Sequence, residues 1–287
     1  MTYMTRVIIN ADDLGVNSHV NKHIEDFIRN GLISSATILA VGEALDDAVR
    51  IAQTYKNVSF GIHLCLDEFN SVSNSSILKK YGIIDDNNNF TKEGIYKIKN
   101  PSRELKQAIY HELKAQVKVL IGKGVKISHF DSHHHFHAKS LWMLQIVSKI
   151  SSEYNINKIR RPFSDSLKIR QNLKSTANNF QEIKISSTQK HTGVLKRLNR
   201  AIVLFNKLLL EKLWVQKAQK SFKITDAFYS YYVLSDLYSE LRPKGKYNLI
   251  ELMCHPGHPE YEYETELIKR LSLNEKLEYK LINYNQL

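Results

Sequence analysis

The feature that most constrains the fold of this chain is a regular alternation of short apolar runs with segments whose apolar residues recur at helical spacing. The apolar runs have the length of strands and predict them at residues 6–11, 36–40, 58–66, 125–131, 158–162, 248–254 and 279–283. Helical spacing between these runs predicts helices at residues 20–30, 44–55 and 102–122, the last with Ser102 as its N-cap. Strands that alternate with helices form parallel sheets, so we expect an α/β fold whose sheet is either open or closed into a barrel.

A length of 287 residues suits one large domain, because α/β barrels of this size are common and no Pro- or Gly-rich linker divides the sequence. We expect a single domain over residues 1–287, with a long polar loop over the site at 71–91 and a helical excursion around 165–223. Within the excursion, an apolar stripe at helical spacing comprises Leu195, Leu198, Ile202, Phe205, Leu209 and Leu213. We expect this stripe to pack on the sheet while the basic residues beside it face solvent. A helix that lies on a membrane surface is the alternative.

No apolar stretch in the sequence is long enough to span a membrane, and its first residues lack the pattern of a secretory signal. These observations indicate a cytoplasmic protein without a transmembrane segment. The two cysteines, Cys65 and Cys254, are too few for a disulfide framework, which fits a reducing compartment. Both lie close in sequence to histidines that could form a site, so ligation of a metal by a thiolate is an alternative. We expect instead that both are small buried side chains.

The formal charge of +12 invites comparison with nucleic-acid-binding proteins. Lys and Arg are spread along the chain, however, and no zinc-finger, RNP-like or helix-turn-helix signature accompanies them. We therefore expect no nucleic-acid partner, although an acidic glycan or an anionic membrane surface is compatible with the charge.

Two adjacent carboxylates follow the first predicted strand, in the sequence N-A-D-D-L-G. Asp12 and Asp13 repel each other unless a cation or a hydrogen-bond donor lies between them. A bound metal would keep one of them ionised and leave the other free to act as a base. The same residues could instead form an N-cap or an Asx-turn for the following helix, and the pair alone does not decide between these interpretations.

Histidines and acids also follow, or lie within, three other predicted strands: His63, Glu251, His255 and His258, and the segment H-F-D-S-H-H-H-F-H at 129–137. If that segment is extended, one face carries His129, Asp131, His133, His135 and His137, and His134 points the other way. Catalytic groups gather where the carboxyl ends of parallel strands meet. An Asp and two His with open positions suit a hydrolytic metal site, whereas the sequence contains no P-loop, dinucleotide-binding glycine motif or G-x-S-x-G motif.

The motifs N-A-D-D-L-G at 10–15, G-I-H-L at 61–64, H-F-D-S-H-H-H-F-H at 129–137 and E-L-M-C-H-P-G at 251–257 resemble those of the YdjC-like carbohydrate deacetylases. That family includes chitooligosaccharide deacetylase and the hopanoid-associated deacetylases. Weaker similarity extends to R-R-P at 160–162 and T-D-A-F-Y at 225–229. The resemblance implies an irregular (β/α) barrel of the TIM type, one divalent cation and an N-acetylated saccharide as substrate.

The resemblance also implies roles for individual residues. The metal ligands would be Asp13, His63 and His133, with Asp12 as general base and His255 as general acid. The cation would activate water and polarise the acetyl carbonyl, and Asp131 would fix the tautomer of a ligating histidine. Contacts to substrate or supporting positions are expected for His129, His135, His137, Arg161 and Glu251, and a structural role for His134.

Two imidazoles favour zinc or a similar transition metal, although the family is commonly described with magnesium, which prefers oxygen ligands. Two other functions stay open: a different metal-dependent hydrolase acting on an amide or phosphoester, and a non-enzymatic protein that binds anionic polymers. A homodimer is the default expectation for the assembly.

Overall fold

The computed structural model describes residues 5–163, 192–230, 247–272 and 279–287, and in these ranges seven strands form one parallel sheet. The strands are β1 (Thr5–Leu14), β2 (Ser35–Ile38), β3 (Ser59–Leu64), β4 (Phe130–Ser132), β5 (Ala227–Ser230), β6 (Leu249–Cys254) and β7 (Tyr279–Leu281). They are ordered β4-β3-β2-β1-β6-β5, and β7 pairs with the first residues of β1. Every pairing between these strands is parallel, so their carboxyl ends meet at one edge of the sheet. The expected α/β fold with a parallel sheet is confirmed.

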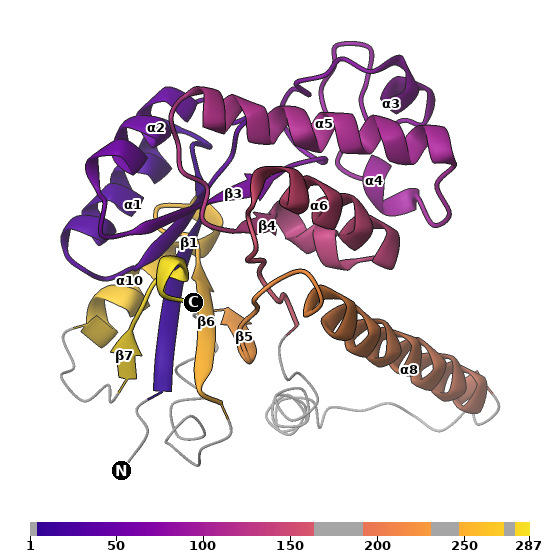
Figure 1. The fold of residues 1–287 in the computed structure, drawn as a ribbon. Coiled ribbons are helices and arrows are strands. Elements are labelled where there is room, and N and C mark those ends of the chain that lie inside the picture. Colours follow the sequence, from indigo (N-terminus) through magenta and orange to yellow (C-terminus); the bar gives the residue numbers. More distant parts are fainter. Residues whose placement is uncertain (1–4, 164–191, 231–246, 273–278) are drawn as a thin grey trace.

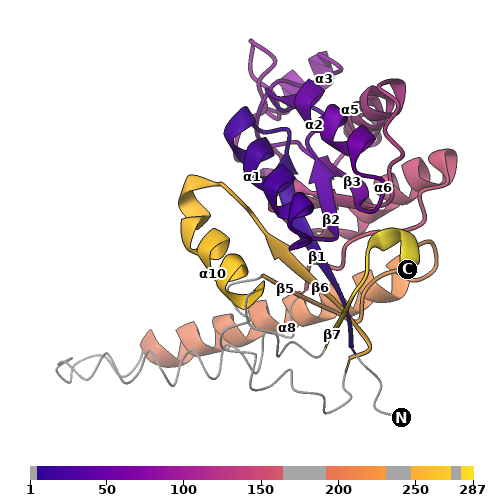
Figure 2. The same cartoon turned by 90° about the vertical axis from the view of Figure 1, so that its left-hand side faces the viewer.

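Helices cover this sheet, and three of the longer ones begin at capping side chains. The longer ones are α1 (Ser18–Arg29), α2 (Leu45–Thr54), α5 (Arg103–Gly122), α6 (Leu141–Tyr154), α8 (Thr192–Ala218) and α10 (Glu262–Ser272). Asn17, Ser102 and Ser140 each accept a hydrogen bond from the backbone N–H three residues later, which satisfies one of the amide groups that a helix start leaves unpaired. In both views, α1 and α10 lie on the same side of the central strands β1 and β6 (Figure 1; Figure 2).

The core lies between the sheet and its helices. The predicted apolar stripe of α5 is buried, and it comprises Leu105, Ile109, Leu113, Val117 and Leu120. The predicted polar loop at 71–91 is more structured than expected. It contains α3 (Ser76–Lys80) and buries Leu78 and Ile83 completely, and α4 (Gly94–Lys97) follows it. This segment therefore contributes buried side chains to the main core.

The sheet is curled, as a half-barrel, and the named strands leave β4 and β5 as its edges. The strand expected at 158–162 is reduced to two isolated bridges, from Ile159 to Phe130 and from Lys158 to Lys223. Pairing stops there because Pro162 has no N–H to donate. In the described residues, the named strands thus form a curled, open α/β sheet, and they do not close into the irregular (β/α) barrel that we expected.

Helix α8 differs most from expectation. Of the predicted stripe, Phe205 is 65% exposed, Leu209 44% and Leu213 37%, so these three side chains do not pack on the sheet. Leu195, Leu198 and Ile202 lie in the part of α8 whose side chains are outside the description. The helix is anchored by its last turns, where Trp214 and Ala218 are buried, and it projects away from the sheet (Figure 1). The expectation failed because helical spacing shows which side chains share a face but not whether a partner lies opposite.

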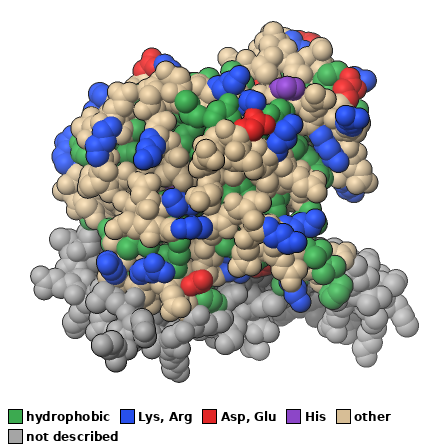
Figure 3. All heavy atoms as spheres, viewed as in Figure 1, with side chains coloured by type: hydrophobic (Ala, Val, Ile, Leu, Met, Phe, Trp, Pro, Cys, Tyr) green, Lys and Arg blue, Asp and Glu red, His purple; other side chains and the backbone are tan. Residues whose placement is uncertain are grey.

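The distribution of basic side chains on the surface is relevant to whether the net positive charge forms a binding patch. Lys and Arg side chains are scattered over the face drawn in Figure 3 rather than gathered in one patch. Among the described helices, none is both long and apolar enough to cross a bilayer.

Candidate active site and metal centre

The two adjacent carboxylates lie at the carboxyl end of β1, and both are buried, Asp12 at 2% exposure and Asp13 at 6%. Successive side chains of a regular strand point to opposite faces. Here the register between β1 and β2 shifts between Ala11 and Leu14, and Asp13 has a left-handed φ of 66°. This irregularity lets both carboxylates approach His63, because a bulge redirects a side chain that would otherwise point away. The N-cap alternative is wrong, since Asn17 caps α1.

Arg160 is the residue that joins the carboxylates, and it is completely buried. Its guanidinium donates two hydrogen bonds to Asp12, at 2.6 and 2.7 Å. It also lies 2.9 Å from Asp131 and donates to Glu251 at 2.7 Å. Burial alone raises the pKa of Asp12, but the charge and hydrogen bonds of Arg160 outweigh it and hold that pKa well below its usual range. Asp12 is therefore ionised at neutral pH.

The sequence pointed to Arg161 as a candidate near the site, and the structure places its neighbour Arg160 among the carboxylates. The side chain of Arg161 donates to the backbone carbonyl of Asp226 and lies 3.5 Å from Glu211. The R-R-P motif pointed to this segment, but two adjacent arginines look alike in a sequence. Which of them faces inward depends on the orientation of the backbone after β4.

His63 lies between two carboxylates. Its Nδ1 is 2.7 Å from Asp131 Oδ1, and its Nε2 is 3.3 Å from Asp13 Oδ1. Burial lowers the pKa of His63, but the charge of Asp131 and its hydrogen bond outweigh burial and raise the pKa to about 9. Asp131 thus accepts the hydrogen bond of Nδ1–H and holds the ring with Nε2 directed toward Asp13.

His133, the first of the three consecutive histidines, is held in a similar way by a residue that sequence reasoning missed. Its Nδ1 donates to Asp67 Oδ1 at 2.8 Å, and Asp67 is only 3% exposed. Burial lowers the pKa of His133, but the hydrogen bond to Asp67 and the charge of Asp13 raise it overall. Asp67 follows β3 in the stretch C-L-D-E, where no spacing distinguishes it from an ordinary surface acid.

One oxygen in this site lacks a hydrogen-bond partner. Asp13 Oδ1 is buried, and among the described residues no donor reaches it with hydrogen-bond geometry, although His63 Nε2 is 3.3 Å away. A buried carboxylate oxygen without a partner is costly, and a cation between an oxygen and an imidazole nitrogen would satisfy both. The residues present therefore fit a bound cation.

Two groups of three side chains have ligand atoms within 4.8 Å of one another in the described part of the chain: Asp12, His63 and Asp131, and Cys65, Asp67 and His133. The expected trio of Asp13, His63 and His133 is a looser set. Asp13 reaches His63, whereas the ring centroids of His63 and His133 are 5.9 Å apart.

His255 follows β6 and approaches the carboxylates from the other side of β1. Its ring stacks on Tyr261 with centroids 4.3 Å apart, and its Nδ1 is 3.3 Å from Glu264 Oε2. Burial lowers the pKa of His255, but Glu264, Asp12 and Asp13 outweigh it and raise that pKa. Glu264, a buried residue of α10, was missed because several glutamates occur in the same stretch. His258 lies beside His255 and accepts from the backbone N–H of Glu260.

The predicted alternation of side chains along 129–137 is wrong. The strand ends at Ser132, and residues His133–Ala138 form a 3-10 helix in which His134 and His135 have left-handed φ angles of 48° and 56°. The local turn returns the chain toward α6, so side chains beyond Ser132 do not share one strand face. His134 is 54% exposed and contacts Asp67, and His135 packs edge-on against Phe228.

Two of the remaining histidines form part of the packing. His129 is completely buried and stacks on Tyr284 with ring centroids 3.5 Å apart. His137 contacts Ser132 Oγ and the carbonyl oxygen of Arg160. Burial lowers the pKa of each ring to about 3, so both are neutral at physiological pH. Glu251, also buried, accepts from Arg160 and from the hydroxyl of Tyr284.

The fold and this site define an α/β protein with a candidate cation-binding centre at the carboxyl ends of a curled parallel sheet. A family model described as "YdjC-like protein" matches residues 6–286. The chain belongs to the YdjC-like protein family, which confirms the resemblance carried by the four motifs.

Several curated relatives are named carbohydrate deacetylase. The one from Brevibacillus brevis is 32% identical over 151 residues, which are 53% of this chain and 57% of the relative. The one from Thermoanaerobacter pseudethanolicus is 28% identical over 62% of this chain and 68% of the relative. The one from Oceanobacillus iheyensis is 26% identical over 252 residues, 88% of this chain and 85% of the relative. The match to the first of these relatives thus spans little more than half of its length.

A solved structure supports the fold. A protein from Enterococcus faecalis V583, provisionally described as a cellobiose-phosphate cleavage protein, superposes with a TM-score of 0.69 over 99% of this chain and 98% of that chain. The sequence identity is 18%, so the likeness concerns the fold alone.

Proposed function

We propose that this protein is a metal-dependent hydrolase that removes the acetyl group from an N-acetylated saccharide. The observation that carries the proposal is the buried Asp13 Oδ1, which has no hydrogen-bond donor and lies 3.3 Å from His63 Nε2. An ionised Asp12 and a histidine of raised pKa, His255, flank this position. The relatives named carbohydrate deacetylase support the same reaction class.

Asp13, His63 and His133 would hold one divalent cation. Asp131 and Asp67 accept a hydrogen bond from Nδ1–H of His63 and of His133, so each Nε2 would offer its lone pair to the cation once its own proton is displaced. When bound, the cation would supply Lewis-acid chemistry, lowering the pKa of water and polarising a carbonyl group. Two imidazoles and one carboxylate favour a zinc-like transition metal over magnesium.

The protein's own side chains would move the protons. Asp12 accepts a proton from the attacking water, and Arg160 orients its carboxylate through two hydrogen bonds. His255, whose pKa is raised, donates a proton to the nitrogen of the leaving amine as the carbon–nitrogen bond breaks. The products are acetate and a free amino sugar, and exchange with solvent then removes the proton from Asp12 and returns one to His255.

The proposal also covers the whole chain as one catalytic domain. The bridges from Ile159 to Phe130 and from Lys158 to Lys223 continue the pairing of β4 toward the segment that precedes β5. They support an irregular (β/α) barrel as the complete architecture.

The test measures metal content and acetate release on the same preparations. We expect wild type to release acetate from N-acetylglucosamine oligomers after metal loading, and His63→Ala to lose at least about 100-fold in rate, since removal of a group at a metal site costs that order. His111→Ala is the matched control, because His111 is exposed on α5. Metal-loaded wild type that releases no acetate from any N-acetylated saccharide would exclude the proposed reaction.

A further inference from the structure

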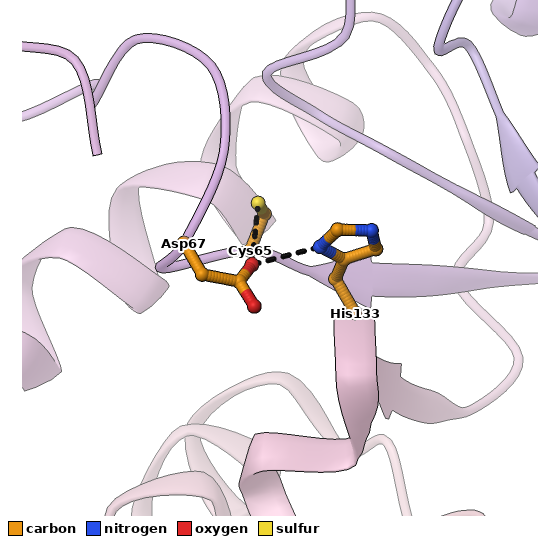
Figure 4. A group of neighbouring side chains, drawn as sticks. All are labelled: Cys65, Asp67 and His133. Atoms are coloured by element: carbon orange, nitrogen blue, oxygen red, sulfur yellow. Dashed lines mark hydrogen bonds and ion pairs between the residues drawn. The ribbon is translucent and has the colours of Figure 1, made fainter. Parts of the chain in front are cut away.

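A second group of ligand atoms lies at the Nδ1 side of His133. Cys65 and Asp67 follow β3, and His133 follows β4 (Figure 4). Cys65 Sγ is 3.5 Å from Asp67 Oδ1, and His133 Nδ1 is 2.8 Å from the same oxygen. One sulfur, one nitrogen and one oxygen therefore converge within 4.8 Å.

The distance from Cys65 Sγ to Asp67 Oδ1 is that of neighbouring ligand atoms in a tetrahedral metal site, and the distance from His133 Nδ1 to the same oxygen is shorter. Bonds of about 2.3 Å to sulfur and about 2.0–2.1 Å to nitrogen or oxygen place neighbouring ligand atoms roughly 3.3–3.7 Å apart. His133 Nδ1–H donates to Asp67. The Cys65 thiol lies within hydrogen-bond distance of Asp67 Oδ1 at 3.5 Å and of the Glu68 carbonyl oxygen at 3.2 Å. A dication would replace both protons and would need only small side-chain movements.

Cys65 is also held in place by α5. The side-chain amide of Gln116 accepts from the backbone N–H of Cys65 at 3.0 Å and donates to its carbonyl oxygen at 2.7 Å. The thiol is fully buried, while His134 contacts the other oxygen of Asp67 and is 54% exposed. A cation from solvent thus has an approach to the group past His134.

We propose that Cys65, Asp67 and His133 form a second cation site, selective for a soft divalent metal such as Zn²⁺ or Cd²⁺. Thiolate and imidazole ligands favour these ions over Mg²⁺. On binding, the Cys65 thiol gives its proton to solvent, and His133 transfers its proton from Nδ1 to Nε2 so that Nδ1 can bind the metal. Only protons move in this step, so neither the thiolate nor the imidazole changes oxidation state and no oxidant or reductant is required.

Occupation of this site has a consequence for the first cation, and this part rests on the proposed function. A His133 that is protonated on Nε2 has no lone pair left for the cation of Asp13 and His63. The two ions therefore compete for one imidazole. Excess Zn²⁺ inhibits the enzyme, and Mg²⁺ does not.

Cobalt(II) alone is the probe, because thiolate ligation produces an intense near-ultraviolet charge-transfer band that nitrogen and oxygen ligands do not. Wild type, Cys65→Ser and Cys254→Ser are titrated with Co²⁺, and bound metal is counted. Cys254 is the matched control, since it also follows a buried strand but donates to the carbonyl of Asn10. We expect the band in wild type and in Cys254→Ser, and we expect Cys65→Ser to lose it.

The outcome does not depend on deacetylase activity, because the band reports binding even if no acetate is released. Cys65 and Cys254 are the only cysteines in the sequence, so a band retained in Cys254→Ser assigns the thiolate to Cys65 even if Cys65→Ser fails to fold. Absence of the band in wild type at saturating Co²⁺, or its persistence in Cys65→Ser, would overturn the proposal.

Discussion

At the scale of single residues, the site depends on one buried guanidinium that neutralises several carboxylates. Arg160 contacts Asp12, Asp131 and Glu251, and none of these four side chains is more than 2% exposed. A buried charge is tolerated only when it is paired, so removing the shared cation leaves three acids without compensation. Sequence motifs identified the three carboxylates but not Arg160, because pairing across the sheet is a property of the folded chain.

We predict that Arg160→Ala lowers the free energy of unfolding by about 3–5 kcal/mol, the cost of breaking a buried ion pair. Arg161→Ala should lower it by no more than about 1 kcal/mol, because the Arg161–Glu211 pair is partly exposed and longer. Urea denaturation of both variants measures the difference. Equal effects of the two substitutions would contradict the central role of Arg160.

At the scale of secondary-structure elements, local patterns predicted strands and helices well where one face is buried along its whole length. The strands near residues 6–11, 58–66 and 248–254 and the helix at 102–122 formed with small changes of bounds. The patterns failed where pairing with a segment distant in the sequence determines whether a strand or helix forms. The segment 125–129 bonds to β3 only in part, through Ser128 and His129, and is not a regular strand. The short strand β5 and helix α6 were not predicted.

Gly61 shows how closely two elements approach at the site. A Cβ at this position of β3 would lie 2.4 Å from the His129 ring, which is stacked on Tyr284 and cannot move away easily. We predict that Gly61→Ala lowers the free energy of unfolding by about 1–3 kcal/mol through overpacking. Gly122→Ala is the control, because nothing lies within 4 Å of a Cβ there, and it should be neutral or stabilise α5 by up to about 1 kcal/mol. Thermal or urea denaturation decides, and a Gly61→Ala protein as stable as wild type would show that β3 and β4 can separate freely.

At the scale of the whole molecule, stability should depend on pH because the folded chain changes the proton affinity of His63. In the metal-free protein, burial lowers its pKa but Asp131 raises it to about 9, above the ordinary value of 6.5. The folded state therefore binds this proton more tightly than the unfolded state. The resulting stabilisation is fully present below pH 6.5 and is lost as pH rises through 9.

We predict that metal-free wild type loses about 2 kcal/mol of unfolding free energy between about pH 7.5 and about pH 9.5, at 1.36 kcal/mol per unit of pKa. The raised pKa values of His133 and His255 act in the same direction. This range lies above pH 6.5, below which the lowered pKa values of His129 and His137 act in the opposite direction. His63→Gln should show a smaller loss over the same range. Urea midpoints recorded with a chelator present measure both, and a wild-type stability that stays flat or increases with pH would contradict the prediction.

The buried network around Arg160 has a consequence for the order in which the molecule is synthesised. Asp12 precedes Arg160 by 148 residues, Glu251 follows Arg160 by 91, and Tyr284, which donates to Glu251, comes 33 residues later still. During translation, Asp12 of β1 thus leaves the ribosome long before Arg160, which neutralises it. Glu251 and Tyr284, which complete the buried network, leave the ribosome later still. Until Tyr284 has emerged, β1 has no fully formed environment in which to be buried, so the nascent chain must keep its earliest strand accessible to water or to a chaperone.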